Sequence, residues 1–182
     1  MTDFSSLPAK TQAHLARVSQ AVAGASPRET KKWKVETKTL IEGGEQPPVI
    51  AEVKKWSENG CLYLYTFNIV SDIIDSSIIM EAYSAAKASK KGNRAYARLN
   101  RPSKCMYVGS SKKINQRLKE HLGFGAKGTY ALQLAYWANQ LPLEFELECA
   151  KYSPGIAAEV IQALEDTLWF EQHPMFGRQG AR

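Results

Sequence analysis

The chain has 182 residues with 44% apolar side chains, which is enough for one well-packed domain, and its 24 Lys and Arg against 18 Asp and Glu give a net charge of +6 that favours a polyanionic partner. Its cysteines, Cys61, Cys105 and Cys149, are odd in number and far apart, which argues against a disulfide framework and a metal cluster. Because no 18-residue apolar run and no leader pattern occur, we expect a soluble, cytoplasmic protein without membrane contact.

The N-terminal part is expected to be a partly helical extension over residues 1–55. Apolar side chains at helical spacing predict a helix over residues 8–23, and residues 26–29 have the form of a capping box with proline at the first helical position. Residues 33–41 alternate like a strand but follow that cap, so helix and strand both stay open there.

The remainder, residues 56–182, is expected to form a second unit of α/β (α+β) class, with a small three-stranded sheet flanked by helices. A helical insertion at about 70–103 would separate the first two strands, and Ser110 or Ser111 would cap the helix that follows the second. In chain order the pattern predicts a strand at 61–67, a helix at 71–89, a strand at 104–109, helices at 114–122 and 129–141, a strand at 143–152 and a helix at 156–172.

Two helices carry side chains whose chemistry stands out. Glu165 borders the apolar face of the last helix, where an unpaired carboxylate is costly, so it needs a partner: a salt bridge, for example to Arg117, or a metal-binding or catalytic role. Arg117 and His121 lie one turn apart on the 114–122 helix, where they suit a phosphate as well as a plain surface position.

Taken together, these residues resemble the GIY-YIG nuclease superfamily. Its signature is two tyrosine-bearing strands, an arginine on the next helix and a metal-binding glutamate on a later one. Here Cys61-Leu62-Tyr63 and Tyr107-Val108-Gly109 are followed by Arg117 and Glu165, and the order of elements agrees. The departures are Cys61 in place of glycine, 43 residues between Tyr63 and Tyr107 in place of some ten to fifteen, and Gly177 where many members carry an asparagine, for which Gln179 would substitute.

The resemblance implies a phosphodiesterase site with assigned roles. Glu165 would bind one divalent metal, Mg²⁺ or Mn²⁺, and Tyr63 would be the base or would order the attacking water. Tyr107 would hydrogen-bond the water or the phosphate, Arg117 would stabilise developing charge, and His121 would support the tyrosine or share in proton transfer. Tyr65 points to the same face of its strand as Tyr63 and is the alternative phenol, although motif register favours Tyr63.

A basic stretch is the second candidate for function. If it is helical, its cations recur every three to four residues and would form a stripe suited to duplex phosphates, unless it is merely a solvated face. The candidate nucleic-acid contacts are Lys87, Lys90, Lys91, Arg94, Arg98, Arg101, Lys112 and Lys113.

These expectations describe a metal-dependent endonuclease that hydrolyses DNA, with double-stranded DNA as partner. A compact restriction-type or defence enzyme fits the size, and such an enzyme would need to form a homodimer, or bind twice, to cut both strands. The alternatives are a nucleic-acid-binding module that kept the fold and lost catalysis, and an α/β domain that binds an acidic partner and matches the motif by accident.

Overall fold

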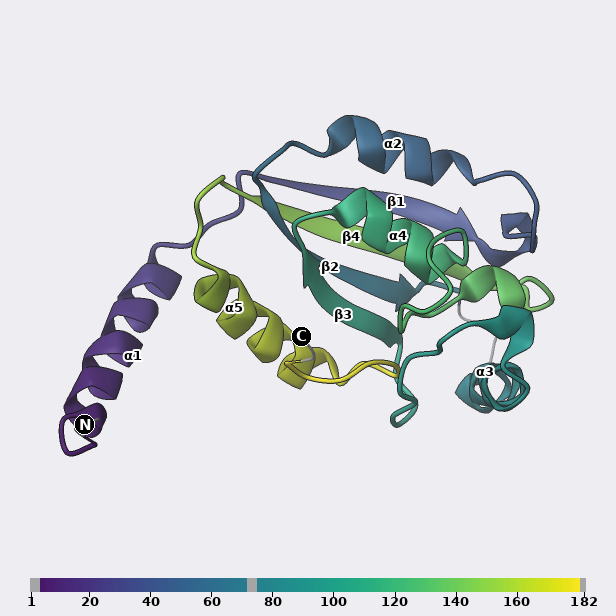
Figure 1. The fold of residues 1–182 in the computed structure, drawn as a ribbon. Helices are drawn as coiled ribbons and strands as arrows, with labels where there is room; N and C mark the ends of the chain where they lie inside the picture. Colours follow the sequence, from purple (N-terminus) through teal and green to yellow (C-terminus); the bar gives the residue numbers. More distant parts are fainter. Residues whose placement is uncertain (1–3, 72–74, 181–182) are drawn as a thin grey trace.

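The fold is built around one four-stranded antiparallel sheet with strand order β1-β4-β2-β3 (Figure 1). The computed structural model describes residues 4–71 and 75–180. The strands are β1 (Glu29–Glu36), β2 (Leu62–Ile69), β3 (Cys105–Ser111) and β4 (Glu144–Tyr152), and the helices are α1 (Leu7–Ala23), α2 (Pro48–Trp56), α3 (Ser76–Ala88), α4 (Ile114–Leu122) and α5 (Ala158–Gln172).

Helices cover both faces of this sheet. Strand β2 is central and buried on both sides, so its side chains alternate between two clusters. Tyr65 and its neighbours of the same parity pack in the main core with α2 and α4, whereas Leu62 and Leu64 pack against α5 on the opposite face. Helix α1 projects away from this body in Figure 1 and buries no side chain.

The fold class is confirmed, but the sheet has four strands where the sequence predicted three. Residues 29–36 pair with β4 along their whole length, and Trp33 and Val35 are buried while their neighbours are exposed. Backbone pairing therefore decides the open choice in favour of a strand as far as Glu36, after which Thr37–Thr39 form a 3₁₀ turn. The capping box predicted at residues 26–29 is wrong because strand β1 begins at Glu29. A boundary between two units at residue 55 stays a prediction. Residues of β1 and α2, which precede it, pack in the same core as residues that follow it.

The basic insertion is only partly helical. Helix α3 begins after Asp75, whose carboxylate accepts a hydrogen bond of 2.9 Å from the backbone N–H of Ser77. It ends at Ala88, because Lys90 adopts a left-handed conformation with φ of 47°. The chain then runs through a 3₁₀ turn and irregular backbone to β3, so the continuous helical stripe of cations was a wrong prediction. Part of the predicted 71–89 helix, residues 72–74, lies outside the described residues.

Two further local predictions were wrong. The helix expected over residues 129–141 is an irregular segment with one 3₁₀ turn, Leu134–Tyr136, and its residues 131–138 are buried without an exposed face between them. The cap expected at Ser110 or Ser111 is absent, since both belong to β3 and Lys113 precedes α4.

The other core elements are confirmed. Strands β2, β3 and β4 and helices α1, α4 and α5 lie where the pattern placed them, and α4 buries Ile114, Leu118 and Leu122 as predicted. The three cysteines are buried free thiols. Within the described part of the chain, no helix has both the length and the apolar character needed to cross a membrane.

Candidate active site

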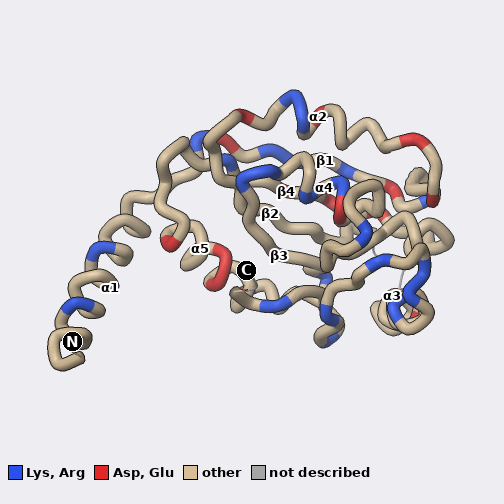
Figure 2. The backbone as a smooth tube through the Cα atoms, in the orientation of Figure 1, with Lys and Arg blue, Asp and Glu red and all other residues tan. Residues whose placement is uncertain are grey.

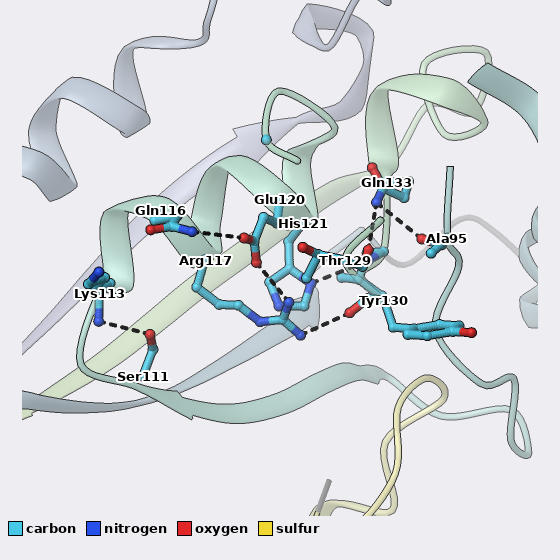
Figure 3. Close-up of polar contacts among 12 residues, drawn as sticks. Ala95, Ser111, Lys113, Gln116, Arg117, Glu120, His121, Thr129, Tyr130 and Gln133 are labelled. Carbon is cyan, nitrogen blue, oxygen red and sulfur yellow. Dashed lines mark hydrogen bonds and ion pairs between the residues drawn. The ribbon is translucent and has the colours of Figure 1, made fainter. Parts of the chain in front are cut away.

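Arg117 of α4 is the centre of a hydrogen-bonded cluster at the outer strand of the sheet. Its Nε donates to the hydroxyl of Tyr65 at 3.3 Å, and its Nη2 donates to the hydroxyl of Tyr107 at 3.0 Å. Nη1 forms a 2.9 Å ion pair with the buried Glu120, and Nη2 also donates to the carbonyl of Tyr130 at 3.0 Å (Figure 3). The guanidinium is therefore held in one orientation by side chains of β2, β3 and α4.

His121 holds the same cluster from the core side, and its hydrogen bonds define its tautomer. The backbone N–H of Leu132 donates to Nδ1 at 3.3 Å, so in the neutral ring the proton sits on Nε2. Nε2 lies 3.1 Å from the Tyr65 hydroxyl and donates to it. The Tyr65 oxygen thus accepts two hydrogen bonds, from His121 and Arg117, which leaves its own O–H to donate elsewhere. We call Tyr65, Tyr107, Arg117 and His121 the inner cluster.

Burial controls the protonation of this cluster. It lowers the pKa of His121 well below its ordinary value, with the Arg117 charge acting in the same direction, so His121 is neutral at pH 7. Burial also raises the pKa of Tyr65 well above 10, helped by Tyr107 and Glu165 and opposed by Arg117. Tyr65 is therefore a protonated phenol, suited to donate a hydrogen bond rather than to act as a standing base.

Gly109 is required for the two tyrosines to approach the same point. It lies opposite Tyr65 in the β2–β3 ladder. A Cβ at this position would lie 2.7 Å from the Tyr65 hydroxyl oxygen and 2.8 Å from a ring carbon of Tyr107, closer than side chains pack. The glycine of the Tyr107-Val108-Gly109 motif therefore leaves the space that the Tyr65 hydroxyl and the Tyr107 ring occupy.

A cleft of about 910 Å³ opens beside the inner cluster. Tyr65, Tyr107 and Arg117 line it on one side, and Glu165 of α5 lines it on the other. Helices α4 and α5 cover opposite faces of the sheet, so the cleft runs around β3, the strand at the sheet's edge. Four of the five predicted catalytic residues thus belong to one region: three line the cleft, and His121 supports them from the core.

Glu165 is the only acidic residue among the described residues that line this cleft, and it is 9% exposed. Its predicted position at a buried helix border is confirmed. Residues 4–71 and 75–180 contain no group of three or more His, Cys, Asp or Glu side chains placed to hold a metal. Glu165 is the carboxylate of this cleft that could hold an ion such as Mg²⁺, which is commonly held by one or two carboxylates together with substrate phosphate.

Tyr63 is the predicted site residue that the structure places elsewhere. Its hydroxyl donates to the carbonyl of Glu58 at 3.1 Å and accepts from the Glu58 N–H at 2.6 Å. Its ring packs against Trp56, and it does not line the cleft. Tyr65, one pleat further along the same face of β2, occupies the position beside Tyr107 that motif register had favoured for Tyr63.

The predicted nucleic-acid contacts divide into three groups. Arg94 is 9% exposed, donates to the carbonyl of Gly125 and the side chain of Gln133, and packs over Tyr136, so it supports the core instead of facing a ligand. The other predicted cations are exposed, and several lie along the stretch from α3 to α4 (Figure 2). Those that do not line the cleft are Lys90, Lys91, Arg101 and Lys113. Those that line the cleft, together with one tail residue, form what we call the basic rim: Lys87, Arg98, Lys112 and Arg178.

The C-terminal tail closes one end of the cleft. Gly177, at the position expected for an asparagine, adopts a φ of 105°, and a Cβ there would lie 2.9 Å from the Tyr107 ring. Asn100 of the insertion holds the tail by donating to the carbonyls of Pro174 and Gly177, at 3.0 and 3.1 Å. Gln179 lines a smaller neighbouring cavity of about 360 Å³.

The constellation of two tyrosines, an arginine, a histidine and a glutamate around β3 agrees with a comparison against family models. Residues 95–166 match the GIY-YIG catalytic domain. The GIY-YIG match covers less than half of the chain, includes Tyr107, Arg117, His121 and Glu165, and begins after β2. The GIY-YIG domain family consists of endonucleases, so residues 95–166 are similar to a nuclease domain. No curated protein and no solved structure matches the chain.

Three residues in or beside the cleft were missed by the sequence analysis. Glu120 could have been found, because it lies three residues after Arg117 on a helix and the two charges are therefore neighbours. Tyr130 and Arg178 carry no such signal, since a loop and a tail bring them to the cleft.

Proposed function

We propose that the protein is a metal-dependent endonuclease that hydrolyses phosphodiester bonds of DNA within the cleft around β3. The observation that carries the proposal is the placement of Arg117, Tyr65 and Tyr107 opposite Glu165 in one cleft. The family match supports the reaction class, and the basic rim supports a polyanionic substrate.

The residues of the inner cluster have distinct tasks in this proposal. Arg117 contacts the scissile phosphate and stabilises the negative charge that grows on it as water attacks phosphorus and the bond to the leaving oxygen breaks. The proton that the water gives up is balanced by the one that the leaving oxygen takes up. Tyr65, protonated and already accepting from Arg117 and His121, donates its O–H to a phosphate oxygen or to the attacking water. His121 acts through Tyr65 and is a positioning residue, because it is fully buried.

Glu165 is the residue that would hold the divalent ion, together with substrate oxygens. When bound, such an ion supplies Lewis acidity at the phosphate and stabilises the leaving oxygen. Glu165 reaches the phosphate from the face opposite Arg117, so substrate would lie across the glycine of β3 between them. A restriction or defence role, homodimer formation, double-stranded substrate and a cytoplasmic location stay predictions.

The test is cleavage of supercoiled plasmid with Mg²⁺ or Mn²⁺ by the wild type, Glu165→Gln and a control, Glu171→Gln. The control removes an exposed carboxylate from the same helix, outside the cleft. We expect the wild type and Glu171→Gln to cut, Glu165→Gln to lose at least about 100-fold in rate, and EDTA to stop cleavage.

Other outcomes separate the alternatives. Folded wild type that binds DNA without cutting any substrate would replace the proposal with a nucleic-acid-binding module. Equal cleavage by wild type and Glu165→Gln would remove Glu165 from the site.

A further inference from the structure

One aromatic ring at the cleft is unused by the proposed chemistry. Tyr130 lines the cleft and is 71% exposed, a high value for a large side chain. Its carbonyl accepts a hydrogen bond from Nη2 of Arg117 at 3.0 Å, so Tyr130 lies directly beside the residue that we propose to contact the phosphate. Figure 3 shows the ring extending away from the guanidinium.

The backbone around Tyr130 is fixed although the ring is exposed. The carbonyl of Thr129 accepts from Gln133, and that of Ala131 accepts from the N–H of Ala97. The next N–H, of Leu132, is bound to His121. The ring is therefore presented by an anchored backbone, so a ligand that packs on it orders a side chain and not a whole loop.

The surroundings indicate the chemistry of that ligand. The basic rim lines the same cleft and suits phosphates, and an exposed aromatic ring beside a phosphate site suits the face of a nucleobase. Bases inside a duplex are stacked on one another and cannot offer a face to a side chain. We propose that Tyr130 stacks on an unpaired base next to the scissile phosphate, so that the preferred substrate is single-stranded or locally opened nucleic acid.

This proposal rests on the proposed function for the position of the phosphate, and its test measures binding in EDTA, without cleavage. The probes are a fluorescein-labelled single strand and the same sequence as a fully paired duplex, each with one 2-aminopurine. The variants are Tyr130→Ala, Tyr130→Phe and Phe170→Ala, the last removing an equally exposed ring, 68%, from α5 outside the cleft.

We expect Tyr130→Ala to weaken single-strand binding about 5- to 100-fold and to abolish the 2-aminopurine quenching seen with the wild type. Tyr130→Phe keeps the ring and should bind within about twofold of the wild type, as should Phe170→Ala. Duplex binding should change far less in all three variants.

Three results would overturn the proposal, and they are distinguishable from one another. Unchanged single-strand binding by Tyr130→Ala excludes stacking. Equal losses on single strand and duplex assign the ring to backbone contact. Wild type that binds neither probe overturns the proposed function together with this inference, whereas binding without cleavage overturns only the proposed function.

Discussion

The inner cluster and the basic rim line the same cleft but are built in opposite ways. The inner cluster is closely bonded: Tyr65 and His121 are almost fully buried, and the guanidinium of Arg117 has four partners. The basic rim consists of long exposed side chains, of which Arg98 and Arg178 leave irregular backbone. The inner cluster fixes the orientation of its side chains, as chemistry at one phosphorus atom requires. The basic rim supplies positive charge on flexible side chains that can adapt to the phosphates of a nucleic acid.

Substitutions in the inner cluster and in the basic rim should therefore have different effects on folding and on binding. Changing a member of the inner cluster leaves buried polar groups without partners, so folding and activity both respond. Changing a member of the basic rim removes charge from solvent, so folding should be indifferent and only binding should respond.

Arg117→Met should give the largest effect. It leaves the Glu120 carboxylate, whose side chain is 7% exposed, without its ion pair, and we expect a loss of about 3–5 kcal/mol in the free energy of unfolding. Urea unfolding measures this loss. Adding Glu120→Gln should recover most of the stability while plasmid cleavage stays at least about 100-fold reduced. A double variant as unstable as the single one would contradict the account of Glu120.

Tyr65→Phe and Tyr63→Phe form a matched pair within one strand. Tyr65→Phe removes the hydroxyl held by Arg117 and His121, and single-turnover cleavage should fall about 100-fold. Tyr63→Phe removes hydroxyl contacts to Glu58 alone, which should cost about 1 kcal/mol of stability with cleavage near the wild-type rate. The reverse pattern would restore Tyr63 as the functional phenol.

His121 should make stability pH-dependent below neutrality. Its pKa in the folded state lies below 6.5, so as pH falls through 6.5 the unfolded chain takes up a proton that the folded chain excludes. Stability is therefore full above pH 6.5 and falls below it by at most about 1.4 kcal/mol per pH unit. Urea midpoints at pH 7.5 and 5.5, above the usual carboxylate range, should differ more for the wild type than for His121→Gln. Equal differences would show that the ring does not titrate with folding.

The basic rim should give the smallest effect. The double variant Arg98→Gln, Lys112→Gln removes two exposed charges, so the slope of log binding constant against log salt should become shallower by about 1–2, with an unchanged unfolding midpoint. Lys54→Gln, Lys55→Gln on α2 removes the same charge away from the cleft and is the control. Titrations at several salt concentrations measure the slope, and identical slopes for the two double variants would make the rim an ordinary solvated face.

Elements that depend on local sequence pattern were predicted, whereas those that depend on contacts between distant parts of the chain were not. Helices with a clear apolar stripe, such as α4, and alternating strands, such as β4, depend on local pattern and were predicted. Strand β1 needed its partner to be recognised as a strand, and the irregular backbone at 129–141 is held by hydrogen bonds to distant residues such as Ala95 and Ala97, which a local pattern does not contain.

The candidate site divides in the same way. Arg117, His121 and Glu165 followed from helix position and the family motif, whereas the choice of Tyr65 over Tyr63 depends on which phenol lies opposite Gly109 across the ladder. Arg94 shows the limit of charge counting: a cation in a basic stretch can be satisfied by the core.

The tail that follows α5 has a consequence for solubility. Strand β3 ends the sheet on one side, and a free lateral edge is a template on which another chain can add a strand. Here the N–H groups of Met175 and Phe176 donate to the carbonyls of Cys105 and Met106, at 2.8 and 2.9 Å, so the beginning of that edge is already occupied. The opposite edge, β1, carries lysines at three of its eight positions, a feature of edge strands that disfavours pairing with another chain. The same short tail that closes the cleft therefore also protects the protein from aggregation through its sheet.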